Sequence, residues 1–347
     1  MELLAFSDLE DEEGCALFGA VAERVYARDP IWSPGSETAW RLRAKELSKA
    51  AGASFQNLVA IDGGEPVARC MPILVRGSKD RGGRPQGWIA FFECEESCPR
   101  AAQALLTAGE SYLSARGACS VQVSRADNQL AGILVGGFDL PHLIWTNHNP
   151  PYYLELLRSC GYQDGIRMVS YRFYRDRVPD FRLNLPGLKV REFDRADLDR
   201  EIRVFHDLQR RIFGYRPGYV RRTLSEDRLQ VEGLLGFLQD DLVIIAETDT
   251  GDPVGLLVCV PDLYQGMRGE PVDRARIVTI GANPAYAARG IGALMGARLM
   301  ENLIEKTKIS YVEGSWVRGD NPSPGLLARR FNALPGREFR LPEKRLA

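Results

Sequence analysis

The sequence lacks both an apolar run long enough to cross a membrane and an excess of charge of either sign. No stretch reaches the ~18 consecutive apolar residues that a spanning helix needs. The 45 Lys and Arg residues are balanced by 46 Asp and Glu residues, which leaves a formal net charge of −1. A nucleic-acid-binding protein usually carries a basic patch. We therefore expect no membrane span and no nucleic acid partner.

Cysteine and histidine are also scarce. The seven Cys residues are scattered and odd in number, which fits the reduced thiols of a cytoplasmic protein. The acidic run at residues 8–13 excludes a secretory signal near the N-terminus. Cys94 and Cys98 form one close pair, but no second pair or neighbouring His completes a zinc set. We expect no metal.

The length of 347 residues suggests two domains. A stretch rich in Pro, Asp and Arg predicts a linker at 177–187, between domains at 1–176 and 188–347. Each half reads strand–turn–strand–strand–helix–strand–helix–strand, so we interpret the chain as a duplication. In the first half the strands are expected near 57–61, 66–75, 88–93, 120–124 and 168–174, and in the second near 189–193, 241–247, 254–260, 276–282, 310–317 and 338–346.

The most informative stretch is residues 277–300. Its β-branched start predicts a strand, and Arg289-Gly290-Ile291-Gly292 follows as a turn. A helix is then expected, because apolar residues recur at i, i+3 and i+4 spacing. Glycines let the backbone approach a ligand, and the free N–H groups at a helix start favour an anion. A diphosphate is a natural ligand for this arrangement.

Two other phosphate-binding motifs do not fit. A Walker loop would need Gly-Lys-Ser/Thr at its end, but Ala293 and Leu294 stand there. A dinucleotide fingerprint needs G-x-G-x-x-G, and the spacing of Gly290, Gly292 and Gly296 does not keep it. The alternative is a flexible glycine-containing loop that binds no ligand.

The turn resembles motif A of the GNAT acyltransferases, Gln/Arg-x-x-Gly-x-Gly/Ala. Gly290 and Gly292 fill its last two fixed places, and the first place falls on Ala287. Residues 26–32 resemble the Tyr-x-x-Asp-Pro-x-Trp motif of a bacterial tandem-GNAT group with a degenerate N-terminal repeat. Further landmarks of that group are matched at 87–93, 137–139, 149–153, 261–262 and 315–317. The resemblance covers nearly the whole chain and implies an α/β (α+β) protein with two tandem GNAT-like domains, each a mixed, splayed β-sheet flanked by helices.

The same resemblance implies a coenzyme A site. In this superfamily loop amides hold the diphosphate, and the pantetheine arm lies between two splayed strands, here 276–282 and 310–317. Amides near Ile280 and Gly281 would polarise the thioester carbonyl, and Gly281 suits a bulge there. The predicted cofactor-binding residues are Thr279, Ile280, Gly281, Ala288, Arg289, Gly290, Ile291, Gly292, Ala293 and Asn321.

The corresponding segment of the first half, residues 94–100, has no glycine. Glu95 and Glu96 would repel a phosphate, and Pro99 lacks an N–H donor. We therefore expect the cofactor in the second half only, with the first half forming a wall of the acceptor pocket. His142 and His148 flank Trp145 in a loop that could line this pocket, whereas His206 is expected to be a packing or surface residue.

Acylation of an amine requires a base, because an alkyl ammonium has a pKa near ~10.4. Glu313 is the preferred base, since strand alternation places it on one face with Tyr311 and Ser315. A salt-bridged or edge-facing Glu is the alternative. Asp262 is the second candidate, although a turn-forming Asp beside Pro is also common. The family often uses a Tyr as acid on the helix expected at 322–331; that stretch has none, and Tyr264 and Ser315 are weak substitutes.

The favoured function is a cytoplasmic N-acyltransferase that uses acyl-CoA, or an acyl carrier protein, and acylates a small-molecule or peptide amine. Residues 263–274 look loop-like and could cap a longer chain, so fatty-acyl transfer to a peptide or amino-acid amine in specialised metabolism is a variant. A non-catalytic sensor of coenzyme A or another metabolite is the rival from another class. A purely structural duplication is a third possibility.

Overall fold

The computed structural model describes residues 1–33, 38–49, 52–124, 132–179, 183–215, 222–286 and 288–346. The chain forms two compact units. Unit 1 comprises Met1–Met168 together with Arg337–Ala347, and unit 2 comprises Val169–Gly336. The division falls within strand β8 (Gln163–Tyr174) and within strand β14 (Leu334–Arg345). Among the described residues, no helix is long and apolar enough to cross a membrane.

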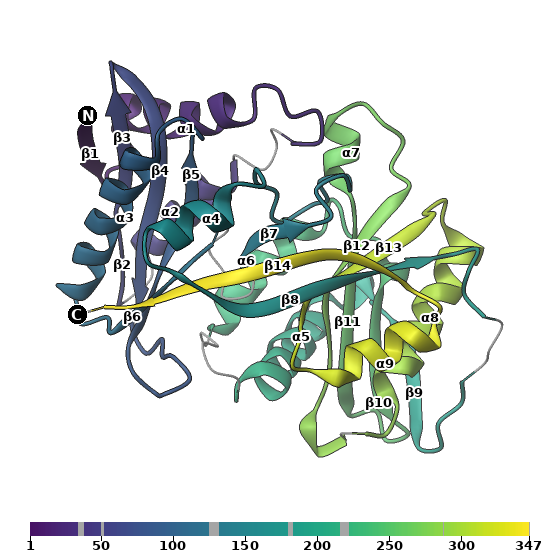
Figure 1. Cartoon of the computed structure of the whole chain (residues 1–347). Helices are drawn as coiled ribbons and strands as arrows, with labels where there is room; N and C mark the ends of the chain where they lie inside the picture. Colours follow the sequence, from purple (N-terminus) through teal and green to yellow (C-terminus); the bar gives the residue numbers. More distant parts are fainter. Residues whose placement is uncertain are drawn as a thin grey trace. The chain divides into compact units, whose positions relative to one another are not determined.

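Unit 1 is built on a mixed sheet with strand order β1-β3-β4-β5-β6-β14 (Figure 1). Neighbouring strands are antiparallel except for β5 and β6, which are parallel. Two short strands join this sheet, β2 beside β4 and β7 beside β14. The strands are β1 (Glu2–Phe6), β2 (Ala53–Phe55), β3 (Asn57–Asp62), β4 (Glu65–Val75), β5 (Gln86–Cys94), β6 (Ser120–Val123) and β7 (Ile133–Gly136).

Helices cover both faces of this sheet. Alternate residues of β3 belong to different hydrophobic clusters, as the period-2 geometry of a strand requires. One cluster includes α1 (Glu12–Val25) and α2 (Thr38–Lys49), and the other includes α3 (Pro99–Ser114) and α4 (Tyr153–Ser159).

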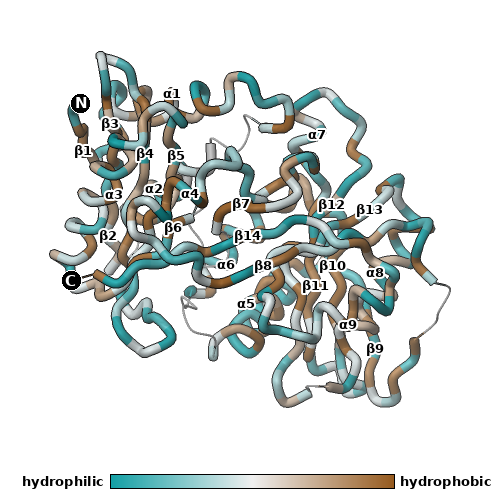
Figure 2. Tube along the Cα trace, in the orientation of Figure 1, coloured by the Kyte–Doolittle hydropathy of each residue, from teal (hydrophilic) through white to brown (hydrophobic). Residues whose placement is uncertain are grey.

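In unit 2 the neighbouring strands follow the order β13-β12-β11-β10-β9. Strands β12 and β13 are parallel, and the other neighbours are antiparallel. Hydrophobic residues dominate β10 and β11 (Figure 2), and every residue of β11 after Pro253 is buried. The strands are β9 (Leu188–Glu192), β10 (Val243–Thr248), β11 (Pro253–Pro261), β12 (Arg274–Ala282) and β13 (Tyr311–Arg318).

Two pairs of helices cover the two faces of the sheet in unit 2. Helices α8 (Ile291–Lys306) and α9 (Pro322–Arg330) share one hydrophobic cluster with the sheet, and α5 (Leu198–Phe213) and α6 (Leu224–Leu234) lie on the other face. Within α8 the buried residues include Ile291, Leu294, Met295, Leu299 and Leu303, which confirms the predicted apolar face. A short helix α7 (Leu263–Met267) follows β11, so the expected loop at 263–274 is partly helical.

The two units repeat one arrangement. Three antiparallel strands, a helix and a parallel strand occur as β3-β4-β5-α3-β6 in unit 1 and as β10-β11-β12-α8-β13 in unit 2. Both repeats have a register shift between their second and third strands, after Arg69 in β4 and after Val258 in β11. The topology supports the interpretation of the sequence as a duplication.

The strand at the C-terminal end departs from the sequence-based domain bounds. It was expected within 188–347, but β14 pairs with β6 and β7 of unit 1, for example Lys344 with Val121. A local pattern identifies such a strand but not its partner, because pairing depends on segments far apart in the sequence. Strands β1, β2 and β7 were not expected from the sequence.

Candidate active site

Strands β12 and β13 separate part of the way along unit 2. Their ladder runs from Arg274 opposite Tyr311 to Ile277 opposite Gly314. Beyond this point β12 continues to Ala282 and β13 to Arg318, and no further pairs join them in the described part of the chain. The side of β12 that faces β13 therefore has backbone groups available for an extended ligand, at the place where the sequence predicted a splay.

The bulge in β12 lies at Val278. The register with β11 passes from Thr279 opposite Val258 to Ile277 opposite Cys259, which leaves Val278 as the extra residue. The expected bulge at Gly281 is therefore wrong. Glycine is needed at 281 because Ile212 of α5 occupies the space that a Cβ would take.

The loop before α8 adopts a left-handed backbone at two positions, Ala288 (φ 62°) and Gly290 (φ 80°). Gly290 is the N-cap residue, and its carbonyl accepts the amides of Ala293 and Leu294, both at 3.0 Å. The amides of the first turn of a helix lack intrahelical acceptors and are positioned for an anion. A Cβ built on Gly292 would meet no described atom within 4 Å, so this first turn is open. Ala287, the first place of the motif, lies outside the described residues.

Two predicted cofactor residues have side chains that bind the protein itself. The guanidinium of Arg289 lies 5.4 Å from the ring centre of Tyr286, and its Nη2 donates to the Pro186 carbonyl at 3.3 Å. The side-chain oxygen of Asn321 caps α9 by accepting the amide of Ser323 at 3.2 Å. Their contact with a cofactor remains a prediction.

A buried polar group lies where β12 and β13 are still paired. Glu313 is 0% exposed and is in register with Arg276, which is itself buried. The Nε of Arg276 donates to Ser315 Oγ at 3.0 Å, its Nη2 donates to the Ser315 carbonyl at 3.2 Å, and its guanidinium stacks 4.3 Å from the ring centre of Trp316. A cation in register with Glu313 is placed to offset the cost of burying a carboxylate.

Asp262, the second candidate base, is also 0% exposed. Its carboxylate lies 3.9 Å from the Nε of Arg274, and its amide donates to the Arg274 carbonyl at 2.8 Å. Its own carbonyl accepts the amide of Gln265 at 3.0 Å, as expected for a turn residue. Tyr264, two residues later, is buried in α7.

Sequence reasoning did not single out Arg274 and Arg276. These two residues are on one face of β12, at positions that alternate with the core residues Ala275 and Ile277. The available signal was a pair of arginines spaced by two in an otherwise apolar strand, which predicts two cations on one face. In the structure, Arg274 on this face lies close to the carboxylate of Asp262, and Arg276 is in register with Glu313.

The corresponding place in unit 1 is filled by protein groups. The Tyr152 hydroxyl donates to the Cys94 carbonyl at 2.6 Å, and the Tyr153 hydroxyl accepts the Cys94 amide at 3.0 Å. Glu95 forms an ion pair with Arg24 at 2.6 Å. Burial raises the pKa of Tyr153 well above its usual value, so this hydroxyl stays protonated.

The three histidines behave differently. The rings of His142 and His148 stack with centres 5.3 Å apart, and His148 Nε2 lies 2.6 Å from the carboxylate of Asp29. Burial alone would raise the pKa of Asp29, but the hydrogen bond to His148 and two backbone amides lower it overall. His206 is buried and contacts Asp227 at 2.7 Å, which ties α5 to α6 and agrees with a packing role.

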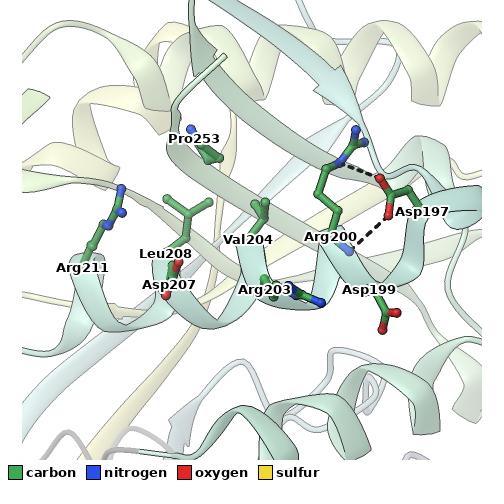
Figure 3. A pocket seen from close by; sticks show the side chains of 9 residues that line it. All are labelled: Asp197, Asp199, Arg200, Arg203, Val204, Asp207, Leu208, Arg211 and Pro253. Carbon is green, nitrogen blue, oxygen red and sulfur yellow. Dashed lines mark hydrogen bonds and ion pairs between the residues drawn. The ribbon is translucent and has the colours of Figure 1, made fainter. Parts of the chain in front are cut away.

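A charged hollow lies along α5 and beside Pro253 (Figure 3). Arginines and aspartates both line it, and Arg200 forms ion pairs with Asp194, Asp197 and Glu201. Because both signs of charge line this hollow, it presents no uniform field to an ionic ligand. Among the described residues, no group of three or more His, Cys, Asp and Glu side chains could hold a metal ion.

Comparisons with known proteins identify the fold. No family model matches the sequence. The chain is 24% identical to protein YghO of Escherichia coli over 364 residues, covering 95% of this chain and 92% of that protein. It is 22% identical over 365 residues to the bacterial ceramide synthase of Caulobacter vibrioides, covering 95% of this chain and 94% of that protein.

A solved tandem GNAT protein from the clavulanic acid biosynthesis pathway matches with a TM-score of 0.61 at 12% identity. The match covers 100% of this chain and 99% of that one. The chain has a tandem GNAT fold. The fold expected from the motifs is therefore confirmed. We call the gap between β12 and β13, which opens after Ile277 and Gly314, the seam.

Proposed function

We propose that this tandem GNAT protein is an N-acyltransferase that moves an acyl group from acyl-CoA, or from an acyl carrier protein, to an amine by direct attack. The observation that carries the proposal is the seam between β12 and β13, which opens after Ile277 and Gly314 beside the buried Glu313. The fold and the name of the Caulobacter relative support the same reaction class.

The donor would lie against unit 2. The amides of Ile291 and Gly292, at the start of α8, are positioned for the diphosphate, and the left-handed Gly290 directly precedes them. The pantetheine arm would extend along the open side of β12. Amides near Ile280 and Gly281 would then donate to the thioester oxygen as negative charge develops on it.

In the proposed step the amine nitrogen attacks the thioester carbonyl carbon, the C–S bond breaks, and coenzyme A leaves as a thiolate. The amine proton passes to the carboxylate of Glu313 and from there to solvent. The Ser315 hydroxyl accepts a hydrogen bond from Arg276 and keeps its own proton for donation, so we assign it a supporting role. Asp262 and Tyr264 are the further candidates in the same unit.

The donor in this proposal is a fatty-acyl thioester, and the acceptor is a small amine. The name ceramide synthase denotes transfer of a fatty-acyl group to an amine, which favours the fatty-acyl variant over plain acetylation. We place the reaction in the cytoplasm, where the seven free thiols of the chain would stay reduced.

The test is a panel of acyl-CoAs from two to sixteen carbons, each incubated with amines, with the amide product followed by mass spectrometry. We expect product with the wild-type chain and a loss of at least about a hundredfold in Glu313→Gln, consistent with the contribution of a positioned base. Coenzyme A binding should be unchanged in that variant. Tight binding without product across the panel would contradict an enzyme and support a sensor.

A further inference from the structure

The backbone groups of β12 change direction part of the way along the strand. Successive residues of a strand point their N–H and C=O groups to alternate neighbours. The Arg274 carbonyl points to β11, because it accepts the amide of Asp262 at 2.8 Å. The Asn283 amide, just beyond the strand, also points to β11, because it donates to the Val254 carbonyl at 2.8 Å. Residues 274 and 283 differ by an odd number of positions, so strict alternation would point them to opposite neighbours.

The bulge at Val278 causes this reversal. Val278 and Thr279 together oppose Val258, so both point their amides to β11. The alternation then resumes one step out of phase. The amides of Ile280 and Ala282 therefore point to the seam, where β12 has no partner strand.

The same bulge leaves the carbonyl of Ser315 without its place in the ladder. In a parallel pair, a residue bonds to the residues on either side of its partner. Ile277 is paired with Gly314, so its carbonyl faces the amide of Ser315. A continued ladder would next join the Ser315 carbonyl to the Thr279 amide, but that amide points to β11. Ser315 is buried, and a buried carbonyl without a partner is destabilising.

The side chain of Arg276 supplies the missing hydrogen bond. Its Nη2 donates to the Ser315 carbonyl at 3.2 Å, and its Nε donates to the Ser315 hydroxyl at 3.0 Å. Its guanidinium is fixed from one side by the ring of Trp316, 4.3 Å away. The planar fork of an arginine presents such a pair of donors in one rigid geometry. A side chain therefore replaces the backbone bond at the point where β12 and β13 separate.

We propose that Arg276 is a positioning residue that holds the seam open for the acyl donor. It satisfies the Ser315 carbonyl, so β13 does not have to pair with β12 beyond Gly314. The inference rests on the proposed function for the identity of the ligand. A seam that is open beforehand lets the pantetheine arm bind without first breaking backbone bonds. Without the fork of Arg276 the strands would pair further, and only the open fraction of the protein would bind the donor.

Arg276→Lys is the decisive variant. Lysine keeps a positive charge in register with Glu313 but lacks the fork that bonds both groups of Ser315. We expect KM for the acyl-CoA to rise at least about tenfold, while kcat at saturating donor changes much less. Arg274→Lys is the matched control. It makes the same change two residues earlier on the same face, close to Asp262, and should leave this KM unchanged.

Residue-resolved hydrogen exchange of the full chain without donor tests the inference in the absence of turnover. In the wild type the amides of Ile280 and Ala282 should exchange quickly, whereas those of Thr279 and Gly281, which point to β11, should exchange slowly. Arg276→Lys should slow exchange at Ile280 and Ala282 at least about tenfold as the strands pair. Arg274→Lys should retain the wild-type pattern.

Two results would overturn the inference and leave acyl transfer intact. One is slow exchange at Ile280 and Ala282 in the wild type, a measurement that requires no variant. The other is a wild-type KM together with a wild-type exchange pattern in Arg276→Lys. A protein that transfers no acyl group but shows the expected exchange in both forms would contradict the proposed function and support the role of Arg276.

Discussion

Arg276 of β12 holds Ser315 of β13 through two hydrogen bonds, from its Nε to the Ser315 hydroxyl and from its Nη2 to the Ser315 carbonyl. Ser315 follows Gly314, at which the ladder between the two strands ends. The arginine therefore links the strands beside the opening of the seam. It also places a buried positive charge in register with Glu313.

The first prediction concerns the stability that this arginine provides. Arg276→Met should lower the free energy of unfolding by about 3 kcal/mol, because the variant removes a cation beside a buried carboxylate. Urea denaturation measures this change. Arg276→Met combined with Glu313→Gln should recover part of the loss, since the second change removes the negative charge. Strictly additive losses would show that the two charges do not stabilise each other.

The second prediction concerns the loop before α8. Gly292→Glu should weaken coenzyme A binding at least tenfold, because it places a negative charge where the diphosphate is proposed to bind. The site of the added side chain is open to at least 4 Å among the described atoms, so the thermal midpoint should stay nearly unchanged. Gly236→Glu is the control, since Gly236 is equally open and lies in the turn after α6. Equal coenzyme A binding by both variants would show that the loop before α8 is not part of the binding site.

The third prediction tests whether Tyr153 of unit 1 contributes to stability but not to coenzyme A binding. Tyr153→Phe should cost about 1–3 kcal/mol of unfolding free energy, because the buried Glu93 and the Cys94 amide both lose a hydrogen-bond partner. Coenzyme A affinity should not change. Tyr215→Phe, at a position that is 66% exposed, supplies the baseline for denaturation. A variant at Tyr153 that alters cofactor affinity without altering stability would assign unit 1 a direct role in binding.

The fourth prediction is a pH dependence. The folded state lowers the pKa of Asp29, so this carboxylate adds stability above its ordinary pKa near 3.8 and loses the contribution as the pH falls through the lowered value. Asp29→Asn should therefore be less stable than the wild type at pH 6, and the difference should shrink below about pH 4. Denaturant titrations at several pH values measure it. A difference that is constant from pH 6 to pH 3 would rule out the ionised Asp29 as the cause.

The sequence predicted the parts of unit 2 that depend on local chemistry. The apolar face of α8, the glycine-containing turn before it and the strand that carries Glu313 each follow from residue spacing or from the special backbone freedom of glycine. The bulge was expected at Gly281, because glycine often marks one, but close packing of Ile212 explains that glycine instead.

Other features depend on contacts that no local pattern contains. β14 belongs to unit 1 because it pairs with β6, whose residues lie more than two hundred positions earlier in the chain. A narrow apolar cavity above β10 and β11 forms only when α5 and α6 meet that sheet face. Val243, Val258 and Thr279 lie opposite one another across β10, β11 and β12. This alignment depends on the register of three strands, which a one-residue shift would alter.

The position of a bound, non-hydrolysable fatty-acyl-CoA analogue in a crystal of the full chain tests the central claim most directly. The account predicts the pantetheine arm in the seam between β12 and β13, with the diphosphate against the amides at the start of α8. Density for the analogue beside β5 and α3 of unit 1, with the seam of unit 2 empty, would contradict it.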